Sequence, residues 1–374
     1  MKEGWEYKKL GEVATFVNGY PFKPSDWKGN GRKIIRIQNL NNPTAEYNYY
    51  DGSIDSKYLV IKGDVLISWS GSLGVFEWSK DEAILNQHIF KVVFNKGKIN
   101  KRFFEYVVSS RLNEMKAKVH GITMQHITKK DFDVIPIPIP PLPEQERIVS
   151  ELDLLTSIIN KQKAQLKELD SLAQSIFYNM FGDPIENPKG WEVKKLGEVV
   201  DITSSLIDPN QEPYCYQYHV SPANILSGTG EILECNLAKD DMLISGKYAF
   251  EKGMILYSKI RPNLNKVAIA PFNGICSADM YPLSIKEKAN NVFICRLLLG
   301  KHFLEYAIKE SGRARMPKIN RESLFAYTFP LPPLSLQQSF ASEIEAIETQ
   351  KALITKSMEE TQRLFDSRMD YWFA

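Results

Sequence analysis

The sequence is poor in the residues that build disulfide frameworks and metal sites. Only four cysteines and five histidines occur among its 374 residues. Cys215, Cys235, Cys276 and Cys295 all lie in the second half without CxxC spacing, and the histidines show no ligand spacing. A disulfide-stabilised secreted domain and a zinc motif are therefore not indicated. We expect reduced, partly buried thiols in a cytoplasmic protein.

Long apolar runs are missing as well. No segment has the length needed to cross a membrane, and the polar start at Met1–Trp5 does not resemble a secretory leader. We therefore expect no membrane partner. A hydrophobic fraction of 43% with 25% charged residues is typical of a folded soluble protein. The net charge of +2 gives no indication about nucleic acid.

The common catalytic motifs are absent from both halves. The Gly-Lys pairs that begin at Gly97, Gly246 and Gly300 are followed by Ile, Tyr and His, so none completes a GxxxxGK[ST] phosphate loop. We find no HExxH, GxSxG or GxGxxG motif, and no Asn/Asp-Pro-Pro-Tyr motif of the kind that amino-methyltransferases use to hold adenine. The sequence therefore predicts a non-catalytic chain with no cofactor or metal of its own.

An internal repeat organises what is present. The segment Gly4–Val13 recurs as Gly190–Val199, with only one of ten residues changed. The proline-rich segment Pro138–Leu142 has a counterpart in Pro330–Leu334, and each is followed three residues later by a glutamine. Two such matches in the same order indicate a tandem duplication.

Each proline-rich segment leads into a long helical pattern. In both patterns the apolar positions alternate steps of four and three, which is a heptad seam. The first seam comprises Ile148, Leu152, Leu155, Ile159, Leu166, Leu169, Ala173, Ile176 and Met180, with Gln162 in one polar slot; the second comprises Phe340, Ile344, Ile347, Lys351, Ile354, Met358, Thr361, Phe365, Arg368 and Trp372. The simplest solution pairs the two helices with each other, antiparallel if a pseudo-two-fold axis relates the halves. The alternative is that each helix pairs with another chain.

The predicted fold class is α+β. We expect two mixed α/β globular domains in tandem, separated by two long antiparallel coiled-coil helices with pseudo-two-fold internal symmetry. The boundaries are 1–135 for the first domain, 136–183 for its proline-rich lead-in and helix, 184–329 for the second domain and 330–374 for the second lead-in and helix. A length of 374 residues also favours two cores over one.

Inside the domains the patterns predict short buried strands and one helix each. In the first domain we expect strands at 33–37, 62–68 and 89–94 and a helix at 101–118. In the second, 252–258 matches the glycine-led strand, and Phe303–Ile308 is taken as the counterpart of the helix.

Basic side chains collect after these helices. Five occur from Arg111 to Lys130 and six from Lys301 to Arg321, as phosphate contacts require, although a solvated helix face gives a similar count. The loops at 121–126 and 312–318 share a frame but carry different hydrogen-bonding groups. This pattern is expected if each domain reads a different DNA sequence through base-edge contacts.

The order of parts, the repeated GWExKKLGEV openings, the Pro-Leu-Pro-Pro-Leu-type lead-ins and the two long helices resemble the specificity (S) subunit of a type I restriction-modification system. The resemblance covers essentially the whole chain. It implies two target-recognition domains, each reading one half of a bipartite, asymmetric site on double-stranded DNA, with the helices as a spacer. Many members carry a helix before the first recognition domain; we expect none here, because the chain begins directly at its opening strand.

The same resemblance implies partner subunits. Two modification (methyltransferase) subunits would carry S-adenosylmethionine, and restriction subunits would carry the nuclease and the ATP-driven translocase, so S-adenosylmethionine, ATP and Mg belong to the partners and not to this chain. Acidic helix residues such as Glu151, Glu168, Glu343 and Glu359 are candidates for meeting the modification subunits, although exposed heptad flanks look the same.

Candidate DNA-contacting residues are the polar and basic side chains that follow strands or lie in the loops. For the first domain they are Arg36, Gln38, Asn39, Ser70, Ser72, Gln87, His88, Gln125, His126 and Lys129, and for the second Asn224, Lys247, Tyr248, Lys259, Arg261, Asn263, Arg313, Arg315 and Lys318. His88 is equally compatible with a core histidine. Two other functions stay open: a single-chain or fused DNA-modifying enzyme whose motif is unrecognised, and a coiled-coil scaffold that binds only protein.

Overall fold

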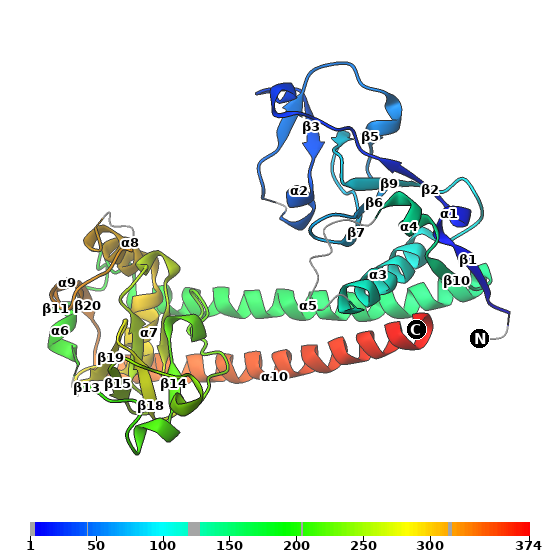
Figure 1. Ribbon diagram of the computed structural model, residues 1–374. Helices are drawn as coiled ribbons and strands as arrows, with labels where there is room; N and C mark the ends of the chain where they lie inside the picture. The colour runs from blue at the N-terminus through cyan, green and yellow to red at the C-terminus, as the bar shows by residue number, and fades with distance from the viewer. Residues whose placement is uncertain (1–3, 43, 119–127, 203–204, 313–315) are drawn as a thin grey trace. The chain divides into compact units, whose positions relative to one another are not determined.

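The chain divides into two compact units, each with a globular domain and part of both long helices. The computed structural model describes residues 4–42, 44–118, 128–202, 205–312 and 316–374. Unit 1 comprises Met1–Lys163 and Lys356–Ala374, and unit 2 comprises Ala164–Thr355. The boundary runs through both long helices, α5 (Leu142–Phe181) and α10 (Leu334–Phe373) (Figure 1). The predicted tandem of two mixed α/β domains with two long helices is confirmed.

Unit 1 contains two four-stranded sheets. The first has the order β2 (Thr15–Asn18), β9 (Ile89–Val93), β6 (Val65–Ser68) and β7 (Gly74–Glu77), and the second has the order β4 (Asn48–Tyr50), β3 (Arg32–Ile35), β8 (Ala83–Leu85) and β5 (Leu59–Val60). All pairs are antiparallel except β3 with β8. The helical segments are α1 (Leu10–Val13), η1 (Pro24–Asp26), α2 (Ile37–Asn41), η2 (Ser56–Tyr58), α3 (Lys101–Lys118) and α4 (Lys129–Asp133). The strands and the helix predicted for this domain are present.

Unit 2 repeats this plan. Its sheets have the orders β12 (Val200–Asp201), β19 (Met280–Ile285), β16 (Ile255–Ser258), β17 (Val267–Ile269) and β13 (Leu206–Ile207), β15 (Lys247–Phe250), β18 (Gly274–Ser277), β14 (Tyr218–Val220). Here too one pair is parallel, β14 with β18. The helical segments are α6 (Leu196–Val199), η3 (Tyr214–Tyr216), η4 (Pro222–Asn224), η5 (Ala238–Asp240), η6 (Pro262–Leu264), α7 (Asn291–Leu299), α8 (Lys301–Glu310) and α9 (Arg321–Ala326).

The repeated opening segment closes each globular domain. β1 (Glu6–Lys9) pairs with β10 (Pro136–Ile139), and β11 (Glu192–Lys195) pairs with β20 (Thr328–Leu331) in the same antiparallel register. After each opening strand a leucine, Leu10 or Leu196, is fully buried. The glutamate of the repeat then caps the short helix that follows, because its carboxylate accepts a 2.8 Å hydrogen bond from the backbone of the preceding lysine in both copies. The repeat therefore has a structural role, because in each domain it pairs the first strand with the last.

A buried glutamine joins each proline-rich segment to the domain that precedes it. Gln145 donates to Pro140 O (2.8 Å) and accepts from Asn100 N (2.9 Å). Gln337 makes the same pair of bonds, to Pro332 O (2.8 Å) and from Asn290 N (2.8 Å). Both side chains are at most 1% exposed, so these bonds satisfy backbone groups that water cannot reach.

In unit 1 the start of α5 packs against the end of α10. Ile148 and Leu152 share a core with Trp372 and Phe373. Gln162, the polar member of the first seam, donates to Ser357 Oγ at 3.0 Å. Nearer the helix end, the Arg368 guanidinium binds both carboxylate oxygens of Glu151, with Nη2 3.1 Å from Oε2. The paired residue numbers rise on one helix as they fall on the other, so the helices are antiparallel.

In unit 2 the end of α5 packs against the start of α10 in the same sense. Ala173, Phe177 and Phe181 share a core with three seam residues of α10, namely Phe340, Ile344 and Ile347. Lys351, a polar interruption of the second seam, lies 2.8 Å from Asp170. Each predicted seam position is buried or half-buried. Within each unit the two helices therefore pair with each other, as predicted.

The two helices end in equivalent aromatic contacts. The Phe181 ring meets the Phe293 ring of α7 edge-on at 4.9 Å, and the Phe373 ring meets the Phe103 ring of α3 at 5.6 Å. After α5, Gly182 adopts the left-handed conformation (φ +80°), and its N–H bonds to Tyr178 O at 2.8 Å. Gly182 therefore caps the end of α5, where a side chain would strain a left-handed backbone.

One predicted element is present but incomplete. Phe303–Ile308 lies in α8, but the counterpart of α3 begins earlier, with α7: α3 starts after Asn100 and α7 after Asn290, the two residues held by the buried glutamines. The helix is split at Gly300, where a Cβ would lie 3.0 Å from Leu297 O. The α7 segment escaped prediction because its residues are apolar on nearly all sides, which removes the amphipathic period.

All four cysteines are free thiols, and two of them, Cys276 and Cys295, are buried. Burial raises the pKa of these two thiols to about 12. Among the residues that the structure describes, no helix combines the length and apolar character needed to span a bilayer.

Replacing Gln337 by methionine is expected to destabilise the protein by about 1–3 kcal/mol, because the buried N–H of Asn290 and carbonyl of Pro332 lose their partners. Urea unfolding of the full chain measures the change. Gln338→Met, at the exposed neighbouring position, is the matched control and is expected to have almost no effect. Equal losses in the two variants would contradict the proposed bridging role.

Glu151→Gln is expected to destabilise unit 1 in a pH-dependent way. The hydrogen bond from Arg368 holds the pKa of the Glu151 carboxyl below its ordinary value of 4.5, so its stabilisation is fully present above that pH and is lost as the pH falls through the lower, folded-state pKa. Urea melts should show a deficit of about 1 kcal/mol at pH 7 that shrinks at acid pH. Glu359→Gln, whose carboxylate lies 4.0 Å from Arg363 on the same exposed helix face, is the control; a deficit independent of pH would exclude the ion pair as its cause.

Candidate nucleic-acid interface

Three chain segments meet at one end of the unit 1 sheets. β3 and β8 are parallel with Ile35 opposite Leu85, so both strands run out at the same edge, where Asn86 N bonds to Ile35 O at 3.1 Å. Arg36 follows one strand and Gln87 the other. In the other sheet, which has the order β2-β9-β6-β7, Ser68 of β6 lies opposite Ile89 of β9. The β6–β7 turn is therefore next to the β8–β9 turn.

Aromatic and polar side chains line this junction. Trp69 N donates to His88 O at 3.2 Å, and the two rings lie 4.9 Å apart. His88 and Gln87 are half-buried, and His88 has a left-handed backbone (φ +71°). Ser70 is half-buried and Ser72 is exposed in the turn that follows Trp69. The structure thus brings together Ser70, Ser72, Gln87 and His88, which are far apart in sequence.

Arg36 is held in place by its neighbours. Its Nη1 donates to Asn48 Oδ1 at 2.6 Å, its Nη2 donates to Gln38 Oε1, and its guanidinium carbon lies 5.2 Å from the centre of the Trp27 ring. Arg36 is half-buried and Gln38 is exposed. A fixed guanidinium beside an exposed amide is a preorganised hydrogen-bonding surface.

Unit 2 has the same junction with different side chains. β14 and β18 are parallel with Val220 opposite Cys276, and Ser258 of β16 lies opposite Met280 of β19. Lys259 N donates to Asp279 O at 3.0 Å, as Trp69 N does to His88 O. Lys259 therefore occupies the place of Trp69, and Asp279 the place of His88.

Two exposed cations lie near Lys259 in unit 2. Ile260 forms a β-bridge with Lys318, and Arg261 N bonds to Pro317 O at 2.8 Å. Arg261, Asn263 and Lys318 are exposed, whereas Lys259 is only 9% exposed and its ammonium lies 5.1 Å from the centre of the Tyr281 ring. Burial, followed by the charge of Lys318, lowers the pKa of Lys259. A group of this kind gains stability when an acceptor or anion approaches.

Lys247 and Tyr248 lie on β15, opposite Ser277 and Cys276 of β18. Lys247 is 5% exposed, its ammonium donates to Ser245 O (2.6 Å) and Ser245 Oγ (2.9 Å), and burial lowers its pKa. Tyr248 is half-buried against a small apolar core. Both residues thus support the junction from the neighbouring strand, and Lys247 is already bonded within the protein.

Two of the predicted contact residues have structural roles. Asn39 Oδ1 accepts from Arg36 N, and its Nδ2 donates to Ala45 O and Glu46 O, with the side chain 4% exposed. Asn224 is its equivalent: Oδ1 accepts from Ser221 N and Nδ2 donates to Glu234 O. Both amides hold the turn after the parallel strand, which leaves them little capacity for a base.

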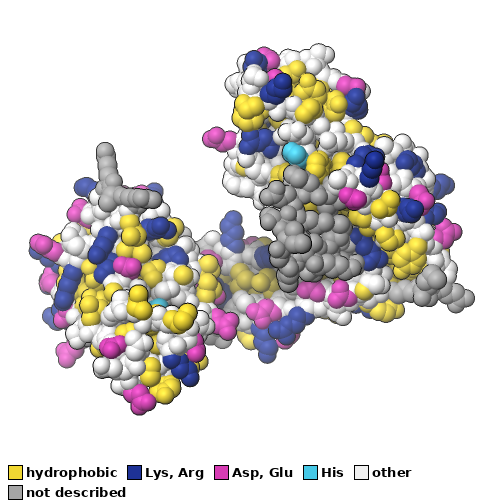
Figure 2. Space-filling model, viewed as in Figure 1, with side chains coloured by type: hydrophobic (Ala, Val, Ile, Leu, Met, Phe, Trp, Pro, Cys, Tyr) yellow, Lys and Arg dark blue, Asp and Glu magenta, His cyan; other side chains and the backbone are white. Residues whose placement is uncertain are grey.

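Of the remaining predicted residues, the structure describes only Lys129. Lys129, at the start of α4, is exposed and its ammonium lies 2.9 Å from Asp133 Oδ2. Gln125, His126, Arg313 and Arg315 lie outside the described residues. On the face drawn in Figure 2, basic, acidic and apolar side chains are interspersed over each unit.

Asp279 and the aromatic neighbours Trp27 and Trp69 also belong to these junctions, although they were not among the residues predicted from the sequence. The signal for Asp279 was available, because His88 and Asp279 each stand directly before an aligned strand, β9 or β19. The part played by Trp27 had no such signal, since its contact with Arg36 depends on the folding of an irregular segment.

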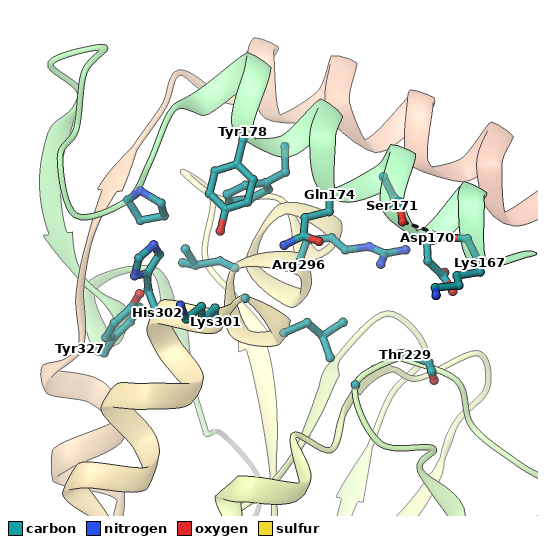
Figure 3. A pocket seen from close by; sticks show the side chains of 17 residues that line it. Lys167, Asp170, Ser171, Gln174, Tyr178, Thr229, Arg296, Lys301, His302 and Tyr327 are labelled. Carbon is teal, nitrogen blue, oxygen red and sulfur yellow. Dashed lines mark hydrogen bonds between the residues drawn. The ribbon is translucent and has the colours of Figure 1, made fainter. Parts of the chain in front are cut away.

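A separate cavity lies in unit 2, away from these residues. It has a volume of about 280 Å³ and is lined by α5, the residues where α7 ends and α8 begins, and the Gly228–Thr229 turn (Figure 3). Three of its polar side chains have close partners: Arg296 with Glu348 (2.7 Å), His302 with Asp183 (3.0 Å) and Asp170 with Lys351 (2.8 Å). None of the predicted site residues lines it. Across the described part of the chain, no three His, Cys, Asp or Glu side chains gather as a metal site would require.

Comparisons with known proteins agree with this arrangement of two similar units. The model of the family described as type I restriction modification DNA specificity domain matches residues 2–168 and 188–363. The specificity subunit of the EcoDI type I restriction enzyme from Escherichia coli is 28% identical over 318 residues, covering 76% of this chain and 70% of that protein. The MjaVIII specificity subunit of Methanocaldococcus jannaschii is 24% identical over 407 residues, covering 97% and 90%.

Solved structures share the fold. The S subunit of a type I restriction-modification system from M. genitalium superposes with a TM-score of 0.56 at 14% identity, covering 99% of this chain and 96% of that one. A chain from work on complex assembly and conformational transition of the type I R-M system gives a TM-score of 0.56 at 18% identity, covering 100% and 98%.

If Asn39 is a turn-holding residue, Asn39→Ala should lower the free energy of unfolding by about 1–3 kcal/mol, because the backbone groups of Arg36, Ala45 and Glu46 lose their partner. Gln38→Ala, at the exposed neighbouring position, should change stability little. Urea unfolding of both variants distinguishes the roles. A stable Asn39→Ala protein would return Asn39 to the set of candidate base contacts.

Proposed function

Because the chain belongs to the type I restriction modification DNA specificity family, we propose that it reads a bipartite, asymmetric site on double-stranded DNA, with one globular domain on each half-site. Its role is recognition and not catalysis. The domains that do this are residues 1–135 and 184–329. The proline-rich segments and helices at 136–183 and 330–374 set the spacing between the half-sites.

The observation that carries this proposal is the pair of equivalent strand-end junctions. The backbone hydrogen bonds at Trp69–His88 and Lys259–Asp279 have the same pattern, but one junction presents an aromatic pair and the other a charged pair. A scaffold that bound only protein through its paired helices would not need different side chains at the two junctions. Two domains that read different bases require it, because base identity is read by the donors and acceptors offered to the groove.

The contact residues fall into two groups. Three exposed cations, namely Arg261 and Lys318 beside the unit 2 junction and Lys129 at the start of α4, are suited to phosphate oxygens, which fix position and carry no sequence information. Arg36, Gln38, Gln87 and His88 in unit 1, and Lys259 and Asn263 in unit 2, are suited to base edges. Asn39, Asn224, Lys247 and Tyr248 support the junctions from within. Gln125, His126, Arg313 and Arg315 keep their places as candidates from the sequence.

The partners follow from the family. Relatives are named as specificity subunits of restriction enzymes, and a structural neighbour comes from work on assembly of the complex. We infer that two modification subunits and, in a complete system, restriction subunits bind this chain. S-adenosylmethionine, ATP and Mg are assigned to those partners. The paired helices, with exposed acidic residues such as Glu168 and Glu343, are the proposed docking surface.

Footprinting with the modification subunits present tests the proposal. The complex should protect two short sequence-specific segments separated by an unspecific spacer. A footprint without sequence preference would favour a protein-only scaffold. Methyl transfer or cleavage by the purified chain alone, with S-adenosylmethionine and Mg supplied, would instead favour a fused enzyme.

Two substitutions should separate position from readout. Lys318→Ala is expected to weaken binding of the complex to all sequences and to reduce the salt slope by about one, because one phosphate contact is lost. Arg315→Ala is expected to relax one half-site only. Lys252→Ala, at the opposite end of β16 from the junction, is the control for general charge. A salt slope unchanged by Lys318→Ala would remove that residue from the phosphate contacts.

A further inference from the structure

We propose that Lys259 and Asp279 together read a G·C base pair in the half-site of the second domain, with Lys259 donating to guanine O6 and N7 and Asp279 accepting from cytosine N4. The inference rests on the proposed function. It adds a residue, Asp279, that sequence analysis did not select, and it assigns a base pair.

The two side chains belong to adjacent strand ends. Lys259 follows β16 and Asp279 precedes β19, and these strands pair with Ser258 opposite Met280. The bond from Lys259 N to Asp279 O (3.0 Å) fixes the two residues side by side. The backbone N–H of Asp279 also donates a hydrogen bond to Ser277 Oγ at 3.2 Å, which holds the turn that contains both residues. The positions of both residues are therefore set by backbone pairing before any ligand is bound.

Lys259 is prepared to donate. Its side chain is 9% exposed and its ammonium rests over the Tyr281 ring. Within the described residues it forms no ion pair, which is unusual for a lysine buried to this extent. Its cationic form is destabilised by burial and by the neighbouring Lys318. Hydrogen bonds to strong acceptors offset that cost, and guanine offers two acceptors on its major-groove edge.

Asp279 determines which ligand fits. It is exposed, and a carboxylate beside the lysine repels a phosphate group, so the pair is a poor phosphate site. Aspartate is suited to the N4 amino donor of cytosine, and lysine to the O6 and N7 acceptors of guanine. A G·C pair offers two adjacent acceptors for the lysine beside the amino donor for the aspartate, whereas an A·T pair offers one acceptor on each side of its amino group. Arg261 and Lys318, both exposed beside the pair, are then left for the flanking phosphates.

The equivalent place in unit 1 excludes the same readout there. Trp69 and His88 occupy the positions of Lys259 and Asp279 and offer neither an ammonium nor a carboxylate. The inference is therefore specific to one half-site, and the other half-site of the same molecule becomes an internal control.

The test uses the complex of the full chain with its modification subunits and a plasmid library in which both half-sites are randomised. Methylated sites are sequenced for the wild type and for Lys259→Met, Asp279→Asn and the control Lys252→Met. At one position of one half-site, the preference for G·C should fall roughly tenfold or more in the first two variants. The consensus of the other half-site, and both consensuses in Lys252→Met, should stay as in the wild type.

Other outcomes have distinct meanings. A uniform loss of methylation with both consensuses unchanged would show a phosphate contact and overturn the inference. Asp279→Asn changes an exposed side chain and keeps the fold even if Lys259→Met does not, so an unchanged consensus in Asp279→Asn alone is enough to reject the assigned pair. If the wild-type complex itself shows no bipartite consensus, the proposed function fails, and that result is visible without any variant.

Discussion

The end of a long helix completes the hydrophobic core of each globular domain, and the rest of the structure depends on this packing. In unit 1 the ring of Phe103 is covered by Phe373, from the end of α10, and in unit 2 the ring of Phe293 is covered by Phe181, from the end of α5. A heptad seam is likewise unable to bury itself. Both requirements are met when each unit contains a part of both helices. Each globular domain is then completed by the end of the helix that follows the other domain in the sequence.

The residues that hold the frame of each domain are separate from the residues that we propose to face the DNA groove. The buried glutamines, the capping glutamates of the repeat and the paired amides of Asn39 and Asn224 bond to backbone groups, which are the same whatever the neighbouring side chains are. Trp69 and Lys259 then occupy one backbone position with opposite chemistry. A change at such a position alters the donors and acceptors offered to a base and leaves the hydrogen bonds of the frame intact.

Much of the fold could be read from the sequence, and the features that only the structure revealed have identifiable causes. The seams were readable because heptad spacing is local, and their polar members, such as Gln162 and Lys351, proved to face partners across the helix pair. Helix α7 was missed because a segment buried on nearly all sides has no polar face to give it a period. Asn39 and Asn224 were selected as base contacts because an exposed amide and a turn-holding amide look alike in sequence, and only their bonding distinguishes them.

The sequence by itself determined the duplication, the two heptad seams, the strands and the type of protein, because each of these is expressed in residues close together in the chain or in a repeat that can be aligned. Only the tertiary structure decided which side chains share a junction. Lys259 meets Asp279, and Trp69 meets His88, through the register of an antiparallel strand pair. Register depends on sheet pairing and burial across the whole domain. It therefore cannot be deduced from the local sequence pattern of either strand.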